Sequence, residues 1–155
     1  MNVRFETKKA FKIAGLVALH SDNDDFPGLW DRLFEQVPYE KLPALGSGEA
    51  FGSCFNYTPE PHGFSYIAGY DVRSAEEAHA LGLEVVEVPE AEYAIVELTG
   101  PVPENIYQGW QFVINEYFPA NGLQHAGTPD HEYYFMGDMS APDYKMELWV
   151  PIVRI

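Results

Sequence analysis

Cysteine is almost absent from this sequence: Cys54 is the only one in 155 residues. A single cysteine cannot form an internal disulfide or a Cys-rich zinc site, so a reducing cytoplasm fits best. Long apolar runs are missing too. The longest, Ala14 to Leu19, is far shorter than the roughly 20 residues that cross a bilayer, and no apolar leader opens the chain. The sequence therefore favours a cytoplasmic protein without a membrane segment.

Basic residues are scarce, because 9 Lys and Arg stand against 24 Asp and Glu, a formal charge of -15. Such a chain repels a phosphate backbone and gains nothing from counterion release, so direct nucleic-acid binding is excluded. The same charge concentrates cations at any acidic cleft.

Motifs for metals and cofactors are also missing. The histidines are scattered and lack the paired spacing of a zinc hydrolase; they are His20, His62, His79, His125 and His131. The sequence contains neither a Gly-rich nucleotide fingerprint nor a G-x-S-x-G elbow. We therefore expect no metal and no cofactor, and we interpret Cys54 as a small buried side chain.

An internal repeat is present instead. Shifting the sequence by 80 residues places Trp30 on Trp110, since 30 + 80 = 110. The same shift matches Leu33 with Val113, Phe34 with Ile114 and Val37 with Tyr117, the i, i+3, i+4, i+7 spacing of an amphipathic helix. Each half thus carries one helix, which Asp24, Asp25 and Pro27 open in the first half.

Strand patterns surround both helices. Apolar runs at 13–19 and 93–98 precede them, and hairpins follow at 51–57 with 64–72 and at 132–136 with 144–155. The chain therefore repeats a strand-helix-strand-strand unit, with pseudo-repeats at about 3–72 and 83–155 inside one domain, 1–155. We predict an α+β fold, in which a curved antiparallel sheet carries both helices on its convex face and a ligand cleft lies between the halves.

The last strand assigns the faces of this sheet. Its even positions are apolar and should meet the helices, which places Glu147 and Trp149 on the concave face. Glu132 and Tyr134 share one parity on the neighbouring strand, and pairing the two strands can place both glutamates on one face. Carboxylates among aromatic rings suit a cationic ligand, although the same groups can perform acid/base chemistry.

Several segments together resemble the GyrI-like small-molecule-binding domain, the effector-binding domain of AraC-type and multidrug-sensing MerR-type regulators. They are FKIAGLVA at 11–18, FSYIAGYDV at 64–72, EYAIVELTG at 92–100, HEYYF at 131–135 and MELWVPI at 146–152, and they span nearly the whole chain. The resemblance implies a pocket for bulky, hydrophobic cations. Glu132 of its E-x-Y element is the implied charge partner, and Tyr134, Glu147, Trp149, Tyr66 and Trp110 are the implied lining residues. Whether Trp30, Trp110 and Tyr66 line the pocket or only pack the core stays open.

Two alternatives follow from the same resemblance. Some members hydrolyse reactive cyclopropane-bearing compounds with a pocket glutamate, which would make Glu132 a general base. Others resemble a gyrase-modulating protein, which would make this chain a protein-interaction module. Binding is favoured over catalysis, and because no helix-turn-helix precedes Phe11, a regulatory role would need a separate regulator or other protein partner.

Overall fold

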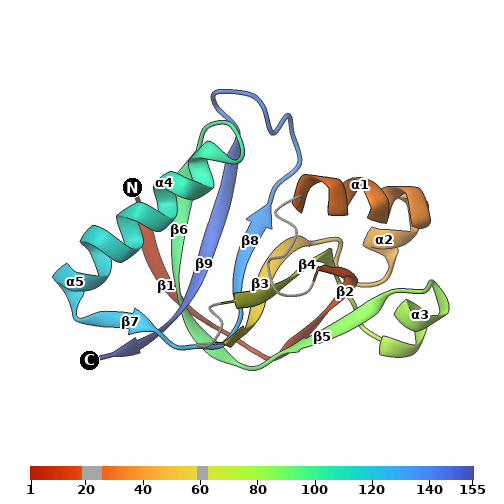
Figure 1. The fold of residues 1–155 in the computed structure, drawn as a ribbon, viewed down its shortest axis with the longest axis horizontal. Helices are drawn as coiled ribbons and strands as arrows, with labels where there is room; N and C mark the ends of the chain where they lie inside the picture. The colour runs from red at the N-terminus through yellow and green to blue at the C-terminus, as the bar shows by residue number, and fades with distance from the viewer. Residues whose placement is uncertain (19–25, 59–62) are drawn as a thin grey trace.

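A computed structural model describes residues 1–18, 26–58 and 63–155 (Figure 1). In the first half it contains β1 (Val3–Lys8), β2 (Phe11–Ala18), α1 (Phe26–Gln36), α2 (Lys41–Ala44), β3 (Ala50–Thr58) and β4 (Gly63–Asp71). The short helix α3 (Ala75–Ala80) leads to β5 (Glu84–Val88), β6 (Ala91–Thr99) and α4 (Glu104–Phe112), which continues through a π-helical turn, Val113–Tyr117, into α5 (Phe118–Asn121). The chain ends with β7 (Leu123–His125), β8 (Asp130–Tyr134) and β9 (Lys145–Arg154).

The predicted repeat of elements is confirmed, and the α+β fold with it. At the 80-residue offset β2 corresponds to β6, α1 to α4, β3 to β8 and β4 to β9. The first strands, β1 and β5, also correspond, although sequence analysis missed both of them. Asp24 and Asp25, proposed to open the first helix, lie outside the described residues.

The first strands are exchanged between the halves. The nine strands of the described residues form one antiparallel sheet in the order β1-β6-β9-β8-β3-β4-β2-β5, with β7 pairing β9. Strand β1 pairs with β6 of the second half, and β5 pairs with β2 of the first. The exchange leaves β1 and β5 at the two edges and puts β8 and β3, one strand from each half, at the centre.

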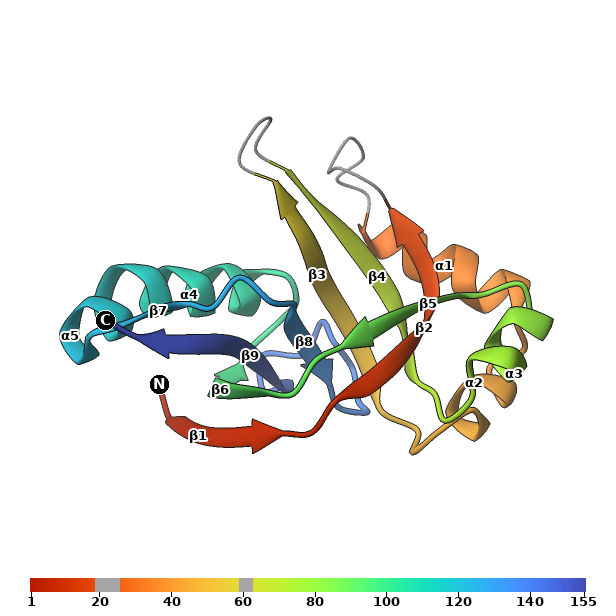
Figure 2. The same ribbon diagram turned by 90° about the horizontal axis from the view of Figure 1, so that it is seen from below.

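Both long helices cover the same face of the sheet, here called the helix face (Figures 1 and 2). Helix α1 lies over β2 and β4, and α4 lies over β6. Leu33 of α1 and Val113 after α4 are fully buried, as the repeat predicted. Figure 1 shows the helices standing apart, with β8 between them.

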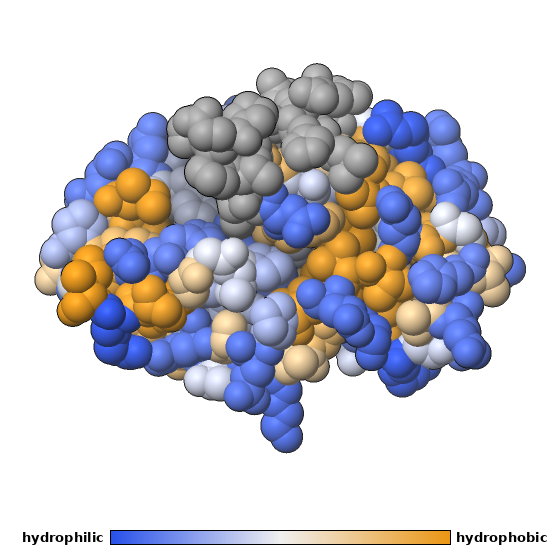
Figure 3. Space-filling view, turned by 60° about the horizontal axis from the view of Figure 1, so that its bottom comes forward, coloured by the Kyte–Doolittle hydropathy of each residue, from blue (hydrophilic) through white to orange (hydrophobic). Residues whose placement is uncertain are grey.

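The opposite face, here called the inner face, is concave. Phe11 on β2 and His131 on β8 are three strand positions apart, which would be about 14 Å in a flat sheet. Their ring centroids nevertheless lie 5.4 Å apart, so the sheet bends over this face. Apolar and aromatic side chains fill it, among them Ile13, Phe51, Ile95 and Trp149. Seen partly from below, hydrophilic residues surround separate apolar areas of the surface (Figure 3).

Among the described residues, no helix combines the length and the apolar character that a bilayer span requires.

Candidate functional site

The carboxylate of Glu132 is the centre of the site. It lies on β8, on the helix face, and two phenols donate hydrogen bonds to one of its oxygens, Oε1. The Tyr66 hydroxyl is 2.9 Å away and the Tyr134 hydroxyl 2.6 Å. The other oxygen, Oε2, accepts no hydrogen bond from the described residues, and the side chain keeps partial contact with solvent. One oxygen is thus anchored and the other is available.

A glycine makes this arrangement possible. Gly52 of β3 lies directly opposite Glu132 of β8, and Tyr66 reaches across β3 from β4. A Cβ on Gly52 would lie 2.0 Å from the Tyr66 hydroxyl and 2.6 Å from Oε1 of Glu132. Only glycine leaves room here for the phenol to meet the carboxylate.

Trp30 of α1 packs against both tyrosines that bind Glu132. Its indole N–H donates to the Tyr66 hydroxyl at 3.4 Å, and its ring meets Tyr134 edge to face at 5.6 Å between centroids. The buried Leu29 and Leu33 hold this helix on the sheet. The sequence offered a signal for Trp30, the repeat that pairs it with Trp110, but that pattern fits a structural role equally well.

Burial governs the electrostatics of the site. It raises the pKa of Glu132 to about 7, against the hydrogen bonds from Tyr134 and Tyr66, which lower it, and the Asp130 charge raises the pKa further. Burial also raises the pKa of both phenols well above the ordinary value for tyrosine, so they stay neutral donors. Near neutral pH the carboxyl group can therefore hold a proton, release it, or exchange it for another cation.

Trp110 of α4 is linked to Glu132 indirectly, through two other residues. Its ring stacks on His125 with centroids 6.4 Å apart, and His125 Nε2 lies 3.0 Å from the buried Asp130 carboxylate. Asp130 in turn acts electrostatically on Glu132. Two residues, His125 and Asp130, thus stand between Trp110 and Glu132.

The expectation that both glutamates share a face is wrong. Glu132 pairs with Leu148, whereas Glu147 pairs with Tyr133, so the two carboxylates point to opposite sides of the sheet. Trp149 pairs with His131 and lies on the inner face with Glu147. The structure thus brings Glu132, Tyr134 and Tyr66 together and separates Glu147 and Trp149 from them.

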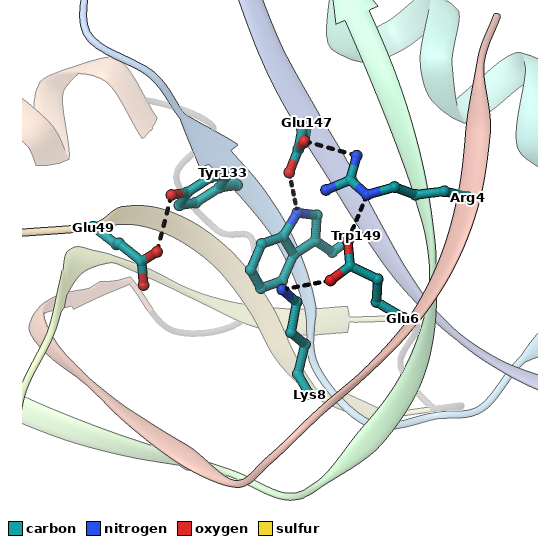
Figure 4. Close-up of polar contacts among 7 residues, drawn as sticks. All are labelled: Arg4, Glu6, Lys8, Glu49, Tyr133, Glu147 and Trp149. Atoms are coloured by element: carbon teal, nitrogen blue, oxygen red, sulfur yellow. Dashed lines mark hydrogen bonds and ion pairs between the residues drawn. The ribbon is translucent and has the colours of Figure 1, made fainter. Parts of the chain in front are cut away.

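Glu147 and Trp149 are already occupied by the chain's own cations (Figure 4). The Arg4 guanidinium pairs with Glu147 at 2.9 Å, and the Glu147 carboxylate accepts the Trp149 indole N–H, also at 2.9 Å. The Lys8 ammonium lies over the Trp149 ring, 4.8 Å from its centroid, and also pairs with Glu6. This cluster attaches the edge strand β1 to β9.

A second buried polar chain also lies on the inner face. Ser53 Oγ and His131 Nδ1 are 2.6 Å apart, and the Tyr93 hydroxyl lies 3.2 Å from His131 Nε2. Burial lowers the pKa of His131 to about 3, so the ring is neutral. Ser53, His131 and Tyr93 have no solvent exposure, which excludes a nucleophilic serine that a substrate could reach.

Comparison with known proteins agrees with this architecture. The family model of the GyrI-like small molecule binding domain matches residues 1–153. The chain belongs to this family. A search of functionally curated protein sequences found no match.

Solved structures share the GyrI-like fold over the whole chain. SAV2435, solved with tetraphenylphosphonium bound, superimposes with a TM-score of 0.82 at 18% identity, covering 99% of this chain and 94% of that one. An integron cassette protein of Vibrio cholerae gives 0.71 at 22% identity, with 97% and 95% covered. The C-terminal domain of EcmrR gives 0.71 at 11% identity, with 99% and 98% covered. In a complex of EcmrR with DNA, this chain covers 58% of the EcmrR chain.

Proposed function

We propose that this GyrI-like domain reversibly binds bulky, hydrophobic organic cations, with Glu132 as the charge partner. The observation that carries the proposal is the asymmetry of the carboxylate, because two phenols hold Oε1 while Oε2 accepts no hydrogen bond from the described residues. The Glu132 side chain is partly exposed, so a ligand can reach the oxygen that the phenols leave open. The available oxygen is the place for a ligand's positive charge.

The surroundings of Glu132 favour a cation of low polarity. Tyr134 and Trp30 are partly exposed beside the carboxylate, and a desolvated cation gains up to about 2 kcal/mol over such a ring face, whereas Tyr66 is buried and contributes its hydroxyl. The carboxylate adds direct Coulomb attraction, which is strong where water is partly excluded. Trp110 lies at the far end of the His125–Asp130 pair, and we propose it as a further wall.

The ligand of SAV2435 supports the same class, since tetraphenylphosphonium is a permanent cation enclosed by four phenyl rings. The complex of EcmrR with DNA suggests how binding could serve regulation. With a charge of -15 this chain is unsuited to bind DNA itself. We propose that it acts in the cytoplasm, as an effector-binding unit beside a separate regulator or as a protein that sequesters such compounds.

Calorimetric titration with tetraphenylphosphonium and the neutral triphenylphosphine oxide tests this proposal. Glu132→Gln keeps the shape and removes the charge, so affinity for the cation should fall by about 1 to 3 kcal/mol while the neutral compound is unaffected. Glu147→Gln is the matched control on the opposite face and should bind the cation like wild type. Equal losses for both ligands would disprove charge pairing, and no binding of any compound would favour the protein-interaction alternative.

Hydrolysis is a second candidate, which the pKa of Glu132, raised to about 7, favours. A carboxylate with this pKa can take a proton from water, while the tyrosine hydroxyls beside it can stabilise charge on a reacting electrophile. Mass spectrometry of cyclopropane-bearing electrophiles incubated in ¹⁸O-water would detect the added oxygen. Turnover by wild type and Glu147→Gln, but not by Glu132→Gln, would identify this domain as a hydrolase.

A further inference from the structure

The edge strand β1 has free hydrogen-bonding groups along its outer side. It forms one end of the sheet and pairs only with β6 among the described strands, and Figure 2 shows it at the border of the molecule. The N–H of Glu97 donates to the carbonyl of Asn2, and these two residues lie opposite each other in the register of β1 and β6. Backbone groups alternate in direction along an antiparallel strand. Val3, Phe5 and Thr7 therefore direct their N–H and C=O groups outward, away from β6.

The sequence of β1 is complementary to itself about Phe5. If a second copy pairs antiparallel with Phe5 opposite Phe5, then Val3 faces Thr7 and Arg4 faces Glu6 of the other copy. This register uses the outward backbone groups of all three odd residues. It also places Arg4 and Glu6, which pair with each other within one chain, opposite Glu6 and Arg4 of the second copy. Arg4, Phe5 and Thr7 are exposed at this edge. Figure 4 shows Arg4 and Glu6 side by side on β1.

We propose that two copies of this chain associate through β1 into a symmetric dimer whose sheets join edge to edge. Two Arg4–Glu6 pairs flank two Phe5 side chains at the twofold axis, and each Phe5 is backed by Tyr117 of its own chain, 6.4 Å away between ring centroids. Charges on an edge strand usually prevent it from pairing with another strand. Here opposite charges meet, and a twofold contact of this kind closes the assembly at two copies.

The other edge of the sheet is protected. The N–H of Val72 donates to the carbonyl of Lys12, which turns the backbone of Ile13 toward β5 and leaves Val85 and Glu87 facing outward. The charged residues of β5, Glu84 and Glu87, are both acidic and exposed. Two paired copies of β5 would bring four carboxylates together, and their repulsion disfavours pairing between two β5 strands. Pairing between two β1 strands brings opposite charges together instead.

Proline substitutions at the two edges test the proposal in the full chain. Thr7→Pro removes an outward N–H from β1, whereas Glu87→Pro removes the equivalent group from β5, and neither disturbs the internal ladder. Sedimentation velocity over a concentration series should show wild type and Glu87→Pro dimerising alike. Thr7→Pro should raise the dimer dissociation constant by about tenfold or more.

Charge substitutions give an independent measurement. Glu6→Lys and Arg4→Glu should each be monomeric, because like charges meet across the axis, and an equimolar mixture of the two should form a heterodimer. The proposal fails if wild type stays monomeric into the millimolar range, if both prolines act equally, or if assembly continues beyond the dimer, as pairing of β1 with β5 would produce.

Discussion

Tyr66 meets Glu132 directly above Gly52, where a Cβ would stand 2.0 Å from the phenol oxygen. Gly52→Ala should therefore push the Tyr66 hydroxyl away from the carboxylate without changing the apolar core. We expect affinity for tetraphenylphosphonium to fall by about tenfold, the loss of one hydrogen bond to a charged group, with the circular dichroism spectrum unchanged.

A double-mutant cycle separates this effect from a general loss of packing. Tyr66→Phe removes the oxygen nearest the new methyl group, so Gly52→Ala should cost less in the Tyr66→Phe background than alone. Strictly additive losses would show that the two positions act independently.

The affinity for permanent cations should depend on pH through Glu132. Burial raises the pKa of this carboxyl group to about 7, so a cation must displace a proton at lower pH. Affinity should be highest above pH 7 and fall by about tenfold for each pH unit below it, as one displaced proton requires. Calorimetry in buffers of different ionisation enthalpy would measure the proton released. A pH-independent affinity in wild type, or the same dependence in Glu132→Gln, would exclude Glu132 as the titrating group.

Residue patterns were sufficient to predict the repeated elements but not the faces of β8. The helices and hairpins follow from apolar spacing that is local and strong, whereas the face of Glu132 depends on how β8 pairs with β9. Ten residues, 135–144, connect these strands, so no tight turn fixes the register, and a shift of one residue exchanges the faces. The contact of Tyr66 with Glu132 spans three strands across Gly52 and has no local signal. Strand β1 did carry one, since V-R-F-E-T-K alternates apolar or neutral residues with charges.

His131 should make the protein sensitive to acid. Burial lowers its pKa from 6.5 to about 3 in the folded chain, so the unfolded chain binds a proton first as the pH falls. The free energy of unfolding should therefore be fully retained above pH 6.5 and decrease from there toward pH 3. His131→Phe should cost about 1 to 3 kcal/mol at pH 7, because Ser53 and Tyr93 lose their partner, but its stability should decline less toward low pH. Urea unfolding of wild type and His131→Phe at several pH values would measure both effects. If the free energies of unfolding of the two proteins depend on pH in parallel, His131 is not a buried neutral side chain.

Glu132 should affect stability in the opposite direction. Its pKa rises from 4.5 to about 7 on folding, so the folded chain holds its proton more tightly than the unfolded chain does. Its contribution is therefore most favourable below pH 4.5 and is lost as the pH rises through 7. Glu132→Gln removes this loss, and the variant should be more stable than wild type at pH 8 by on the order of 2 kcal/mol, with the difference shrinking toward pH 4. Saturating tetraphenylphosphonium should reverse the order at pH 8, since it stabilises only a folded chain that binds it. If Glu132→Gln is less stable than wild type at both pH 4 and pH 8, Glu132 supports the fold. If the variant is more stable at pH 8 without ligand and less stable with tetraphenylphosphonium, the Glu132 carboxylate destabilises the free protein and serves to bind the cation.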